Sequence, residues 1–493
     1  MEKVSGRFDL IISKKNEVYV RVETEPNIAR ELSDFFTFEV PGARFMPTYK
    51  KRIWDGKIRL YNQMNGEIYL GLIPYIEEFA KRNDIDIEYK GDVNATQSSF
   101  THGVCKGFIG NVKPKSNGKS IQLRDYQMDA VVHAIRNNRS LLLSPTASGK
   151  SLIIYLLSRW YESDRILILV PTTSLVEQMY TDFLDYGYLE SKMQKIYQGY
   201  SKDITKEVTI STWQSLYKMP RKFFEQFGCI LGDEVHLFKA KSLTNIMNKM
   251  HITKYRHGFT GTLDGMQTHR LILEGLFGSV NRVTSTKELM EKKTLAKLNI
   301  RCIVLQYPDK DRKFMKDQNY QDEVDLLVRD ERRNKFIVDL TTHLKGNTLV
   351  LFQFVEKHGA VLYDMMKDLD RKVFYVWGGT DTQTREDIRE ITEKEKDAII
   401  VASYGTFSTG INIRNLHNVV FSSPSKSRIR VLQSIGRGLR QGTDKSTATL
   451  YDIADDLTWK TKQNFTLRHF MERINIYNEE EFDYEIKNLP IES

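Results

Sequence analysis

A turn of small residues ending in Gly149-Lys150-Ser151 holds the residue types of this sequence that are most directly suited to chemistry. It lies between apolar runs at 141–143 and 152–157, which predicts a buried strand followed by a helix. Backbone N–H groups at a helix N-terminus favour phosphate, Lys150 would reach the β- and γ-phosphates, and the Ser151 hydroxyl would hold Mg²⁺. The pattern therefore predicts an ATP site, although Ser144 stands where the general phosphate-loop pattern has its first Gly. The residues expected to contact the nucleotide here are Ser144, Pro145, Thr146, Ala147, Ser148, Gly149, Lys150 and Ser151.

Two adjacent carboxylates, Asp233 and Glu234, follow an apolar run at 229–231 that is predicted to be a strand. The carboxyl ends of parallel strands are where such sheets bind ligands. We expect Asp233 to join Ser151 in holding Mg²⁺, and Glu234 to be the general base that orients water toward the γ-phosphate. In isolation, an Asp-Glu pair at a strand end is more often a surface turn. Its place downstream of the phosphate loop, within a parallel-sheet pattern, favours the catalytic interpretation.

A predicted helix carries Gln433, Arg437 and Arg440 at positions i, i+4 and i+7, and therefore on one face. Two guanidinium groups and an amide suit the charge that develops on a phosphate during transfer. An exposed basic helix is the alternative. The catalytic interpretation is favoured because the second half of the chain repeats an α/β pattern without a phosphate loop of its own, so it can complete the site of the first half.

The order of apolar runs and helical segments predicts the domain organisation. Strands without polar alternation, flanked by helices, indicate parallel sheets covered on both faces. The fold class is thus α/β, with two doubly wound domains in tandem after a small α+β domain, and a polar segment with Pro and Gly between them. The expected boundaries are 1–110 for the small, DNA-binding domain, 111–120 for the linker, 121–290 for the ATP-binding domain, 291–456 for the second parallel-sheet domain and 457–493 for a helical tail.

Composition narrows the class of protein. Of 493 residues, 40% are apolar and 28% charged, no run of 18 apolar residues occurs, and the first residues lack the apolar core of a signal peptide. A soluble protein of the cytoplasm is expected, the host cytoplasm if a phage encodes it. Cys105, Cys229 and Cys302 are far apart and odd in number, which excludes a CxxC zinc site and suggests structural roles. The net charge of +9 favours a polyanion partner.

A basic segment lies in the N-terminal domain, where residues 44–59 hold six Lys or Arg and one acid, Asp55. Strand-like alternation around Asp55-Gly56 predicts a β-hairpin over 49–60. Its cations would pair with DNA phosphates, and Trp54 either stacks on an exposed base or anchors the turn by packing. The DNA contacts expected here are Lys50, Lys51, Arg52, Trp54 and Lys57.

Further segments occur in the order in which one enzyme family carries its motifs. They are Arg124-Asp125-Tyr126-Gln127, Pro171-Thr172-Thr173-Ser174-Leu175, Ser211-Thr212-Trp213-Gln214-Ser215, Thr260-Gly261-Thr262 and the segment from Ser403 to Asn412. With the phosphate loop and the Asp233-Glu234 pair, they make residues 120–456 resemble the superfamily 2 helicases of the DExH type. The resemblance implies two RecA-like domains that close on ATP and Mg²⁺ and open after hydrolysis.

The same resemblance implies a role for individual residues. Arg124 and Gln127 would read adenine, and Gly410 would contact the nucleotide from the second domain. Thr172, Thr212 and Ser403 would contact the nucleic-acid backbone. Thr260 and Thr262 would couple hydrolysis to domain motion, and His236, which is otherwise a hydrogen-bonded polar residue, would link them to the nucleotide.

Short strings narrow the resemblance to the phage helicases of recombination and repair. They are Ser211 to Ser215, Leu289-Met290-Glu291, Arg332-Arg333-Asn334-Lys335 and Arg52-Ile53-Trp54-Asp55-Gly56-Lys57. This resemblance implies action on branched DNA, namely stalled forks, D-loops, R-loops and Holliday junctions, with 3′ to 5′ polarity. Single-stranded DNA, RNA in RNA–DNA hybrids and a single-strand-binding protein are further expected partners, and a monomer is expected.

Three other functions stay open at this point. An RNA helicase and the motor of a restriction system would share the same motifs, although no nuclease or methylase domain is evident in the sequence. A DNA-binding or annealing module with a weak, vestigial ATPase is the third. ATPase stimulation by DNA and RNA substrates, and the effect of Lys150→Ala, would separate these alternatives.

Overall fold

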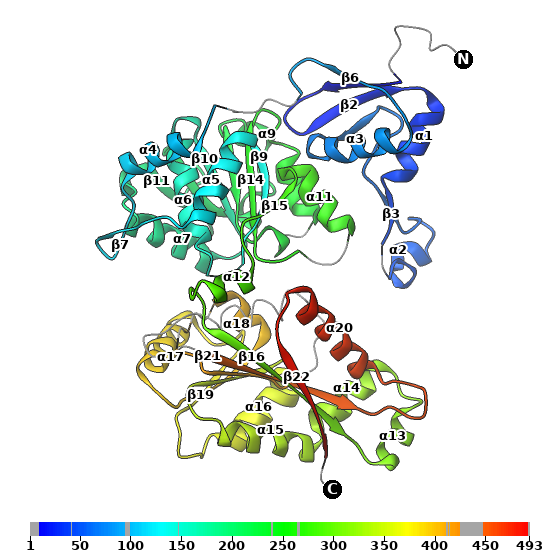
Figure 1. The fold of residues 1–493 in the computed structure, drawn as a ribbon, viewed down its shortest axis with the longest axis vertical. Helices are drawn as coiled ribbons and strands as arrows, with labels where there is room; N and C mark the ends of the chain where they lie inside the picture. Colours follow the sequence, from blue (N-terminus) through cyan, green and yellow to red (C-terminus); the bar gives the residue numbers. More distant parts are fainter. Residues whose placement is uncertain are drawn as a thin grey trace. The chain divides into compact units, whose positions relative to one another are not determined.

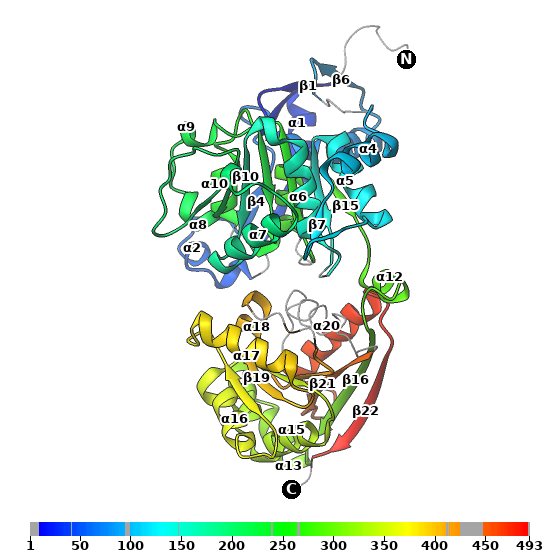
Figure 2. The same cartoon turned by 90° about the vertical axis from the view of Figure 1, so that its left-hand side faces the viewer.

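The computed structural model describes most of the chain, which divides into two units. The described residues are 9–40, 42–93, 99–145, 147–237, 240–263, 267–410, 413, 415–423 and 447–491. Contacts divide the chain into one unit of Met1–Ser144 with Gly149–Val283 and another of Pro145–Ser148 with Thr284–Ser493. Figures 1 and 2 show the elements of each unit. None of the described helices is both long and apolar enough to cross a membrane.

The first unit begins with a small mixed sheet in the strand order β5-β2-β1-β6. β1 pairs antiparallel with β2 and parallel with β6. Figure 1 shows α1 and α3 beside this sheet, and their apolar residues Leu32, Ile76 and Phe79 share a core with Leu10 and Ile68 of the strands. The bounds are β1 Leu10–Lys14, β2 Tyr19–Thr24, β5 Glu67–Tyr69, β6 Ile87–Lys90, α1 Pro26–Phe35 and α3 Ile73–Arg82. The small α+β domain predicted from the sequence is confirmed.

An arm extends from this small domain and carries the basic segment (Figure 1). Its two strands, β3 (Thr37–Glu39) and β4 (Lys57–Arg59), are antiparallel, and the short helix α2 (Pro47–Lys50) lies between them. The hairpin expected over 49–60 is therefore wrong. Pro47, whose fixed φ suits the first turn of a helix, starts α2, and the left-handed Arg52, at φ 56°, ends it.

Residues 111–120, expected to be a linker, contain ordered elements. Helix α4 (His102–Val112) ends there, and β7 (Lys115–Ser116) and β8 (Lys119–Ser120) form a hairpin. Its turn is Asn117-Gly118, with φ of 49° and 75°, a pair that favours two-residue hairpins. Asp185 accepts hydrogen bonds from the Ser116 hydroxyl at 2.8 Å and the Asn117 N–H at 2.7 Å. These bonds attach the hairpin to the neighbouring parallel-sheet domain.

A parallel sheet of seven described strands forms the rest of the first unit, in the order β11-β12-β10-β13-β14-β9-β15. Its strands are β9 Arg139–Leu143, β10 Ile166–Val170, β11 Met193–Ile196, β12 Val208–Thr212, β13 Cys229–Gly232, β14 Tyr255–Thr260 and β15 Val280–Arg282. The helices are α5 Asp125–Asn137, α6 Lys150–Trp160, α7 Thr173–Asp185, α8 Trp213–Leu216, α9 Arg221–Phe224, α10 Ala240–Met247 and α11 Gln267–Phe277. Strands such as β10 are buried at every residue, which is why they read as continuous apolar runs.

The small domain packs closely on this parallel-sheet domain. A Cβ atom placed on Gly71 would lie 2.1 Å from the Glu274 carbonyl oxygen of α11, so no other residue fits there without a shift. Glu17, in the turn between β1 and β2, accepts a bond from Arg139 at 2.7 Å, and Arg139 begins the strand that leads to the phosphate loop. The arm thus belongs to a domain that is fixed to the first parallel sheet.

The second unit holds another parallel sheet of seven described strands, in the order β18-β19-β17-β20-β21-β16-β22. Its strands are β16 Lys297–Gln306, β17 Thr348–Phe352, β18 Val373–Val376, β19 Ile399–Ser403, β20 Asn418–Phe421, β21 Thr447–Asp456 and β22 Tyr484–Pro490. Its helices are α12 Thr286–Glu291, α13 Asp309–Met315, α14 Tyr320–Arg329, α15 Glu331–His343, α16 Ala360–Met366, α17 Thr382–Lys394, α18 Tyr404–Gly410 and α20 Phe465–Glu479. Two tandem parallel-sheet domains are confirmed.

The end of the chain differs from the helical tail that was expected. It contains α20, but it then returns as β22, which pairs parallel with β16 from Ile300 opposite Tyr484 to Gln306 opposite Pro490. β22 is an exposed edge strand with alternating polar residues, so its sequence lacks the continuous apolar run that marks the central strands. The segment after Asp456 is part of the second sheet domain.

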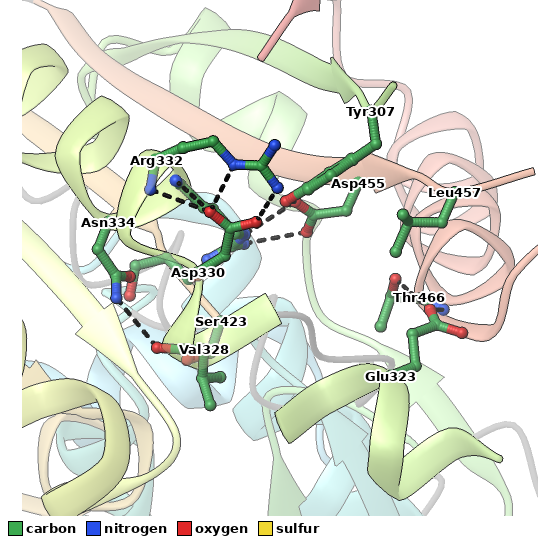
Figure 3. Close-up of polar contacts among 12 residues, drawn as sticks. Tyr307, Glu323, Val328, Asp330, Arg332, Asn334, Ser423, Asp455, Leu457 and Thr466 are labelled. Carbon is green, nitrogen blue, oxygen red and sulfur yellow. Dashed lines mark hydrogen bonds and ion pairs between the residues drawn. The ribbon is translucent and has the colours of Figure 1, made fainter. Parts of the chain in front are cut away.

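Buried ion pairs hold the second unit together (Figure 3). Arg333 of α15 is fully buried, and its guanidinium donates to both oxygens of Asp455 at 2.8 and 3.0 Å and to the Ser422 carbonyl at 2.8 Å. The Tyr307 hydroxyl donates to the same carboxylate at 3.0 Å. Glu323 accepts from the backbone N–H groups of Phe465 and Thr466 at 2.8 and 2.7 Å, which anchors the start of α20. Each of these buried charged groups thus has partners on another element: Arg333 of α15 on β21, and Glu323 of α14 at the start of α20.

The Arg333–Asp455 pair yields a prediction for stability. Arg333→Leu leaves a buried carboxylate without its countercharge, so the free energy of unfolding of the second unit should fall by about 3–5 kcal/mol. Arg329→Leu, which replaces an exposed arginine of α14, should change it by less than about 1 kcal/mol. Amide hydrogen exchange of β16 and β21 in rising urea measures both. Equal exchange in the two variants would contradict the role assigned to the pair.

Candidate nucleotide site and nucleic-acid surface

Three motifs meet at one edge of the first parallel sheet. β13, β14 and β9 are neighbours in this sheet, and they end at Gly232, Thr260 and Leu143. Because the strands are parallel, the residues after these ends lie along the same edge. The Ser144 N–H donates to the Thr260 carbonyl at 2.8 Å, and the Asp233 N–H donates to the Leu169 carbonyl of β10 at 2.8 Å. The phosphate loop, the carboxylate pair and the Thr260-Gly261-Thr262 segment are therefore brought together.

The phosphate loop has the backbone that its sequence suggests. α6 begins at Lys150, and the preceding Gly149 is left-handed at φ 83°. A Cβ atom on Gly149 would lie 2.3 Å from the Gln127 amide nitrogen, so glycine leaves the space that this buried side chain occupies. The Gln127 amide oxygen accepts from the Arg124 N–H at 3.0 Å at the start of α5. The residues expected to read adenine are thus adjacent to the loop.

Lys150 lies between the two carboxylates. Its ammonium group is hydrogen-bonded to Glu234 and lies 3.8 Å from the Asp233 carboxylate. The side chains of Lys150, Asp233 and Glu234 are only 12%, 10% and 21% exposed. Burial raises the pKa of Asp233 to about 6; the Lys150 charge acts in the opposite direction and the Glu234 charge adds to the rise. A lysine and two acids are therefore held in a mostly dry space where a phosphate and a cation would find partners.

The donors present suit Mg²⁺. This cation prefers hard oxygen ligands and keeps several waters, so it needs few groups from the protein. Asp233 supplies a carboxylate that is costly to bury as an anion, and Ser151 supplies a hydroxyl on the first turn of α6. Within the described ranges, no three His, Cys, Asp or Glu residues gather as a separate metal centre. Cys105, Cys229 and Cys302 are buried free thiols.

A chain of polar contacts leads from Glu234 to the third motif. The His236 Nδ1 atom lies 3.4 Å from the Glu234 carboxylate and 2.6 Å from the Thr260 hydroxyl. The Thr260 hydroxyl donates to the Thr262 carbonyl at 2.6 Å, so Nδ1 is assigned as the donor to Thr260. Glu234 itself is left-handed, at φ 50°, an uncommon backbone for a residue with a side chain. A continuous series of polar contacts thus connects Glu234, His236, Thr260 and Thr262.

The residues expected to contact the nucleic-acid backbone lie at strand ends. Thr172 caps α7, and its hydroxyl accepts from the Leu175 N–H at 3.4 Å. Thr212 ends β12 and is only 4% exposed, with its hydroxyl 2.9 Å from that of Ser215. Ser403 ends β19 in the second unit, with its hydroxyl 2.8 Å from that of Thr406. Thr172 and Thr212 share one sheet edge, since β10 and β12 are parallel neighbours.

The arm presents the basic segment to solvent. Lys50, Lys51, Arg52 and Lys57 are exposed. Trp54 is half-buried and donates its indole N–H to the Lys57 carbonyl at 2.8 Å, which favours its role as an anchor of the turn. The arm also holds an open hollow of about 800 Å³. Arg44, Tyr49, Lys50, Arg52, Ile53, Trp54 and Asp55 line this hollow.

Sequence reasoning missed two exposed apolar side chains of this arm. Phe45 is 81% exposed and Ile53 is 74% exposed, between the cations of the same segment. A single exposed apolar residue is ordinary, and no periodicity marked this pair as unburied.

Several residues of the expected site lie outside the described residues. They are Thr146 and the second-domain residues Gln433, Arg437 and Arg440. Gly410 is the last residue of α18.

Three family models and a solved structure match this chain. Residues 9–90 match the family model described as DNA helicase UvsW, N-terminal. Residues 120–265 match the model of the type III restriction enzyme, res subunit, and residues 332–442 match the helicase conserved C-terminal domain. The crystal structure of T4 UvsW matches with a TM-score of 0.53 and 34% identity, over 98% of this chain and 100% of that one.

Two curated relatives carry the comparison further. A DNA 3′-5′ translocase of Sulfurisphaera tokodaii, XPB2, is 25% identical over 65% of this chain and 79% of its own. The ATP-dependent DNA helicase uvsW of Enterobacteria phage T4 is 36% identical over 96% of this chain and 97% of its own. The resemblance to phage helicases noted from the short strings is confirmed, and the chain belongs to the UvsW family of ATP-dependent DNA helicases.

Proposed function

We propose that this helicase remodels branched DNA, such as stalled forks, D-loops, R-loops and Holliday junctions, and hydrolyses ATP at a site divided between its two sheet domains. The observation that carries the proposal is the meeting of Lys150 with Asp233 and Glu234 at the carboxyl edge of β9 and β13. Gln433, Arg437 and Arg440 would supply the second half.

The contacts among the described residues support a different role for each of them in hydrolysis. A nucleotide's phosphates would draw the Lys150 ammonium from Glu234, which frees that carboxylate to accept a proton from the attacking water. Mg²⁺, held by Ser151 and Asp233, would neutralise charge on the phosphates. Gln127 and Arg124 would orient adenine beside Gly149, with Gly410 contacting the nucleotide from the second domain. His236, Thr260 and Thr262 would couple the change in the contacts of Glu234 during hydrolysis to motion of the domain.

Nucleic acid would bind along the carboxyl edges of the sheets and at the arm. Thr172 and Thr212 lie on the edge that also carries the nucleotide residues, which supports coupling between DNA contact and hydrolysis. Ser403 would extend this path onto the second domain. The arm's Lys50, Lys51, Arg52 and Lys57 would contact a further DNA segment at the branch, with Trp54 holding the turn. A 3′ to 5′ direction is supported by the likeness to a relative named as a translocase of that polarity.

The biological setting follows as part of the same proposal. A monomer working in the cytoplasm of a phage-infected cell would act with a single-strand-binding protein. RNA would be a partner only within RNA–DNA hybrids. ATPase rates measured on single-stranded, forked, four-way, RNA–DNA hybrid and RNA substrates test this proposal. Forked and four-way DNA should stimulate most, and strongest stimulation by RNA alone would favour an RNA helicase.

Glu234 and Lys150 can be tested by substitution. Glu234→Gln should lower kcat for ATP by about 10²- to 10⁴-fold, because the amide cannot accept the proton from water, while ATP still binds. Lys150→Ala should weaken ATP binding itself and abolish branch migration. Steady-state ATPase and fluorescent-nucleotide titration measure both. Glu31→Gln, at an exposed position of α1, is the matched control and should behave as the unmodified protein.

The outcome of Lys150→Ala also separates the motor from an annealing module. Strand annealing can persist without ATP, but branch migration cannot. If branch migration survived in this variant, the motor mechanism would be refuted.

The arm gives a second prediction. Neutralising Lys50, Lys51 and Arg52 to Gln should weaken junction binding and reduce the slope of log K against log salt by about 2 to 3, because each phosphate contact contributes about 0.9. The matched control neutralises Lys345, Lys372 and Lys396, exposed lysines that precede β17, β18 and β19 respectively, at the amino-terminal edge of the second parallel sheet. Filter binding to a four-way junction across salt concentrations measures both triples. Identical slopes would remove the arm from the DNA interface.

A further inference from the structure

The Ser151 hydroxyl has a fixed partner in the structure, the phenol of Tyr186. The two oxygen atoms are 2.8 Å apart, and either can donate. Ser151 is the second residue of α6, whereas Tyr186 follows the last residue of α7. Tyr186 lies in none of the segments that resemble helicase motifs, so the motif comparison assigns it no role.

Tyr186 is held in place from several sides. Its ring packs edge-on against Tyr155 of α6, with centroids 5.4 Å apart at 67°. Its backbone N–H donates to the Asp182 carbonyl at 2.9 Å, and its carbonyl accepts from the Lys115 N–H of β7 at 3.3 Å. The neighbouring Asp185 binds the β7–β8 hairpin. The phenol oxygen is therefore set against α6 by packing and by backbone bonds.

The chemistry of a hydroxyl ligand explains what such a partner would do. A serine that coordinates a cation does so through a lone pair of its oxygen, so its O–H proton must point elsewhere and needs an acceptor. Without one, a serine near a helix start can turn to bond a backbone carbonyl of the preceding turn. The phenol of Tyr186 is neutral at physiological pH, and its oxygen can accept a hydrogen bond from the Ser151 hydroxyl at 2.8 Å. Groups behind a metal ligand commonly fix its orientation in this way.

We propose that Tyr186 is a positioning residue for Mg²⁺·ATP: its phenol oxygen accepts a hydrogen bond from the Ser151 hydroxyl, so that a lone pair of the serine oxygen faces the cation. This inference rests on the proposed role of Ser151. It gives Tyr186 a role in the nucleotide site that acts through Ser151. The inference is based on the contact between the Ser151 and Tyr186 hydroxyls, and on the aromatic packing against α6 that holds the Tyr186 ring in place.

Tyr186→Phe tests the proposal because it removes one oxygen atom and leaves the ring packing. The Mg²⁺ concentration for half-maximal ATPase should rise about 10-fold or more, the range typical when a partner of a metal ligand is lost. Binding of a fluorescent ATP analogue in EDTA should be unchanged, which also shows that the variant is folded. A purely structural role would alter both measurements together or neither.

Tyr188→Phe is the matched control. Tyr188 lies in the same aromatic cluster, 5.9 Å from Tyr155 between ring centroids, and its buried hydroxyl has no hydrogen-bond partner in the part of the chain that the structure describes. Its Mg²⁺ dependence should equal that of the unmodified protein. A rise like that of Tyr186→Phe would show a general effect of the cluster and overturn the proposal.

Ser151→Ala separates failure of this inference from failure of the proposed site. If Ser151→Ala leaves the Mg²⁺ requirement unchanged, Ser151 is not a ligand and both ideas fall. If Ser151→Ala raises the requirement and Tyr186→Phe does not, only the inference falls. In the double variant, Tyr186→Phe should add nothing to the effect of Ser151→Ala. Additive effects would place the action of Tyr186 elsewhere and refute the inference.

Discussion

The direction of the parallel strands is the constraint on which the rest of this structure depends. All strands of the first parallel sheet run the same way, so the residues that follow β9, β13, β14, β10 and β12 lie on one edge. Groups that are far apart in sequence, Lys150 and Glu234 among them, come into contact for that reason. The same edge carries Thr172 and Thr212. The proposed nucleotide and DNA contacts would thus share one sheet edge, which would suit coupling between them.

Buried charged groups have different roles in the two sheet domains. In the second unit, Arg333 and Asp455 are fully buried, meet in bidentate geometry and also bond Ser422 and Tyr307, so their charges are satisfied within the fold. At the nucleotide edge, one lysine faces two carboxylates, and burial raises the pKa of Asp233. The first arrangement stabilises the domain. The second leaves negative charge that a cation would relieve, and perturbed groups of this kind are typical of functional sites.

Local sequence predicted the central strands and the turn before α6 correctly, and it failed where segments distant in the chain pair with each other. The run at 141–143 marked β9, and Gly149 marked the turn before α6. β14 lacks the continuous apolar run of its neighbours because Arg256 and His257 interrupt it. Both are buried: the Arg256 guanidinium donates to the Thr253 carbonyl, and His257 lies beside the Ser140 hydroxyl. The basic segment was predicted as a hairpin around Asp55-Gly56, yet β4 pairs with β3, a strand about twenty residues earlier.

By itself, the sequence determined the class of fold and the use of ATP, because small-residue turns, apolar runs and paired carboxylates are patterns formed by neighbours along the chain. Only the tertiary structure decided which distant groups meet. It brought His236 to Thr260 and Tyr186 to Ser151, fixed the small domain to the nucleotide-binding sheet, and added β22 to the second sheet. These contacts depend on the packing of whole elements, and packing over long separations leaves no local pattern in the sequence.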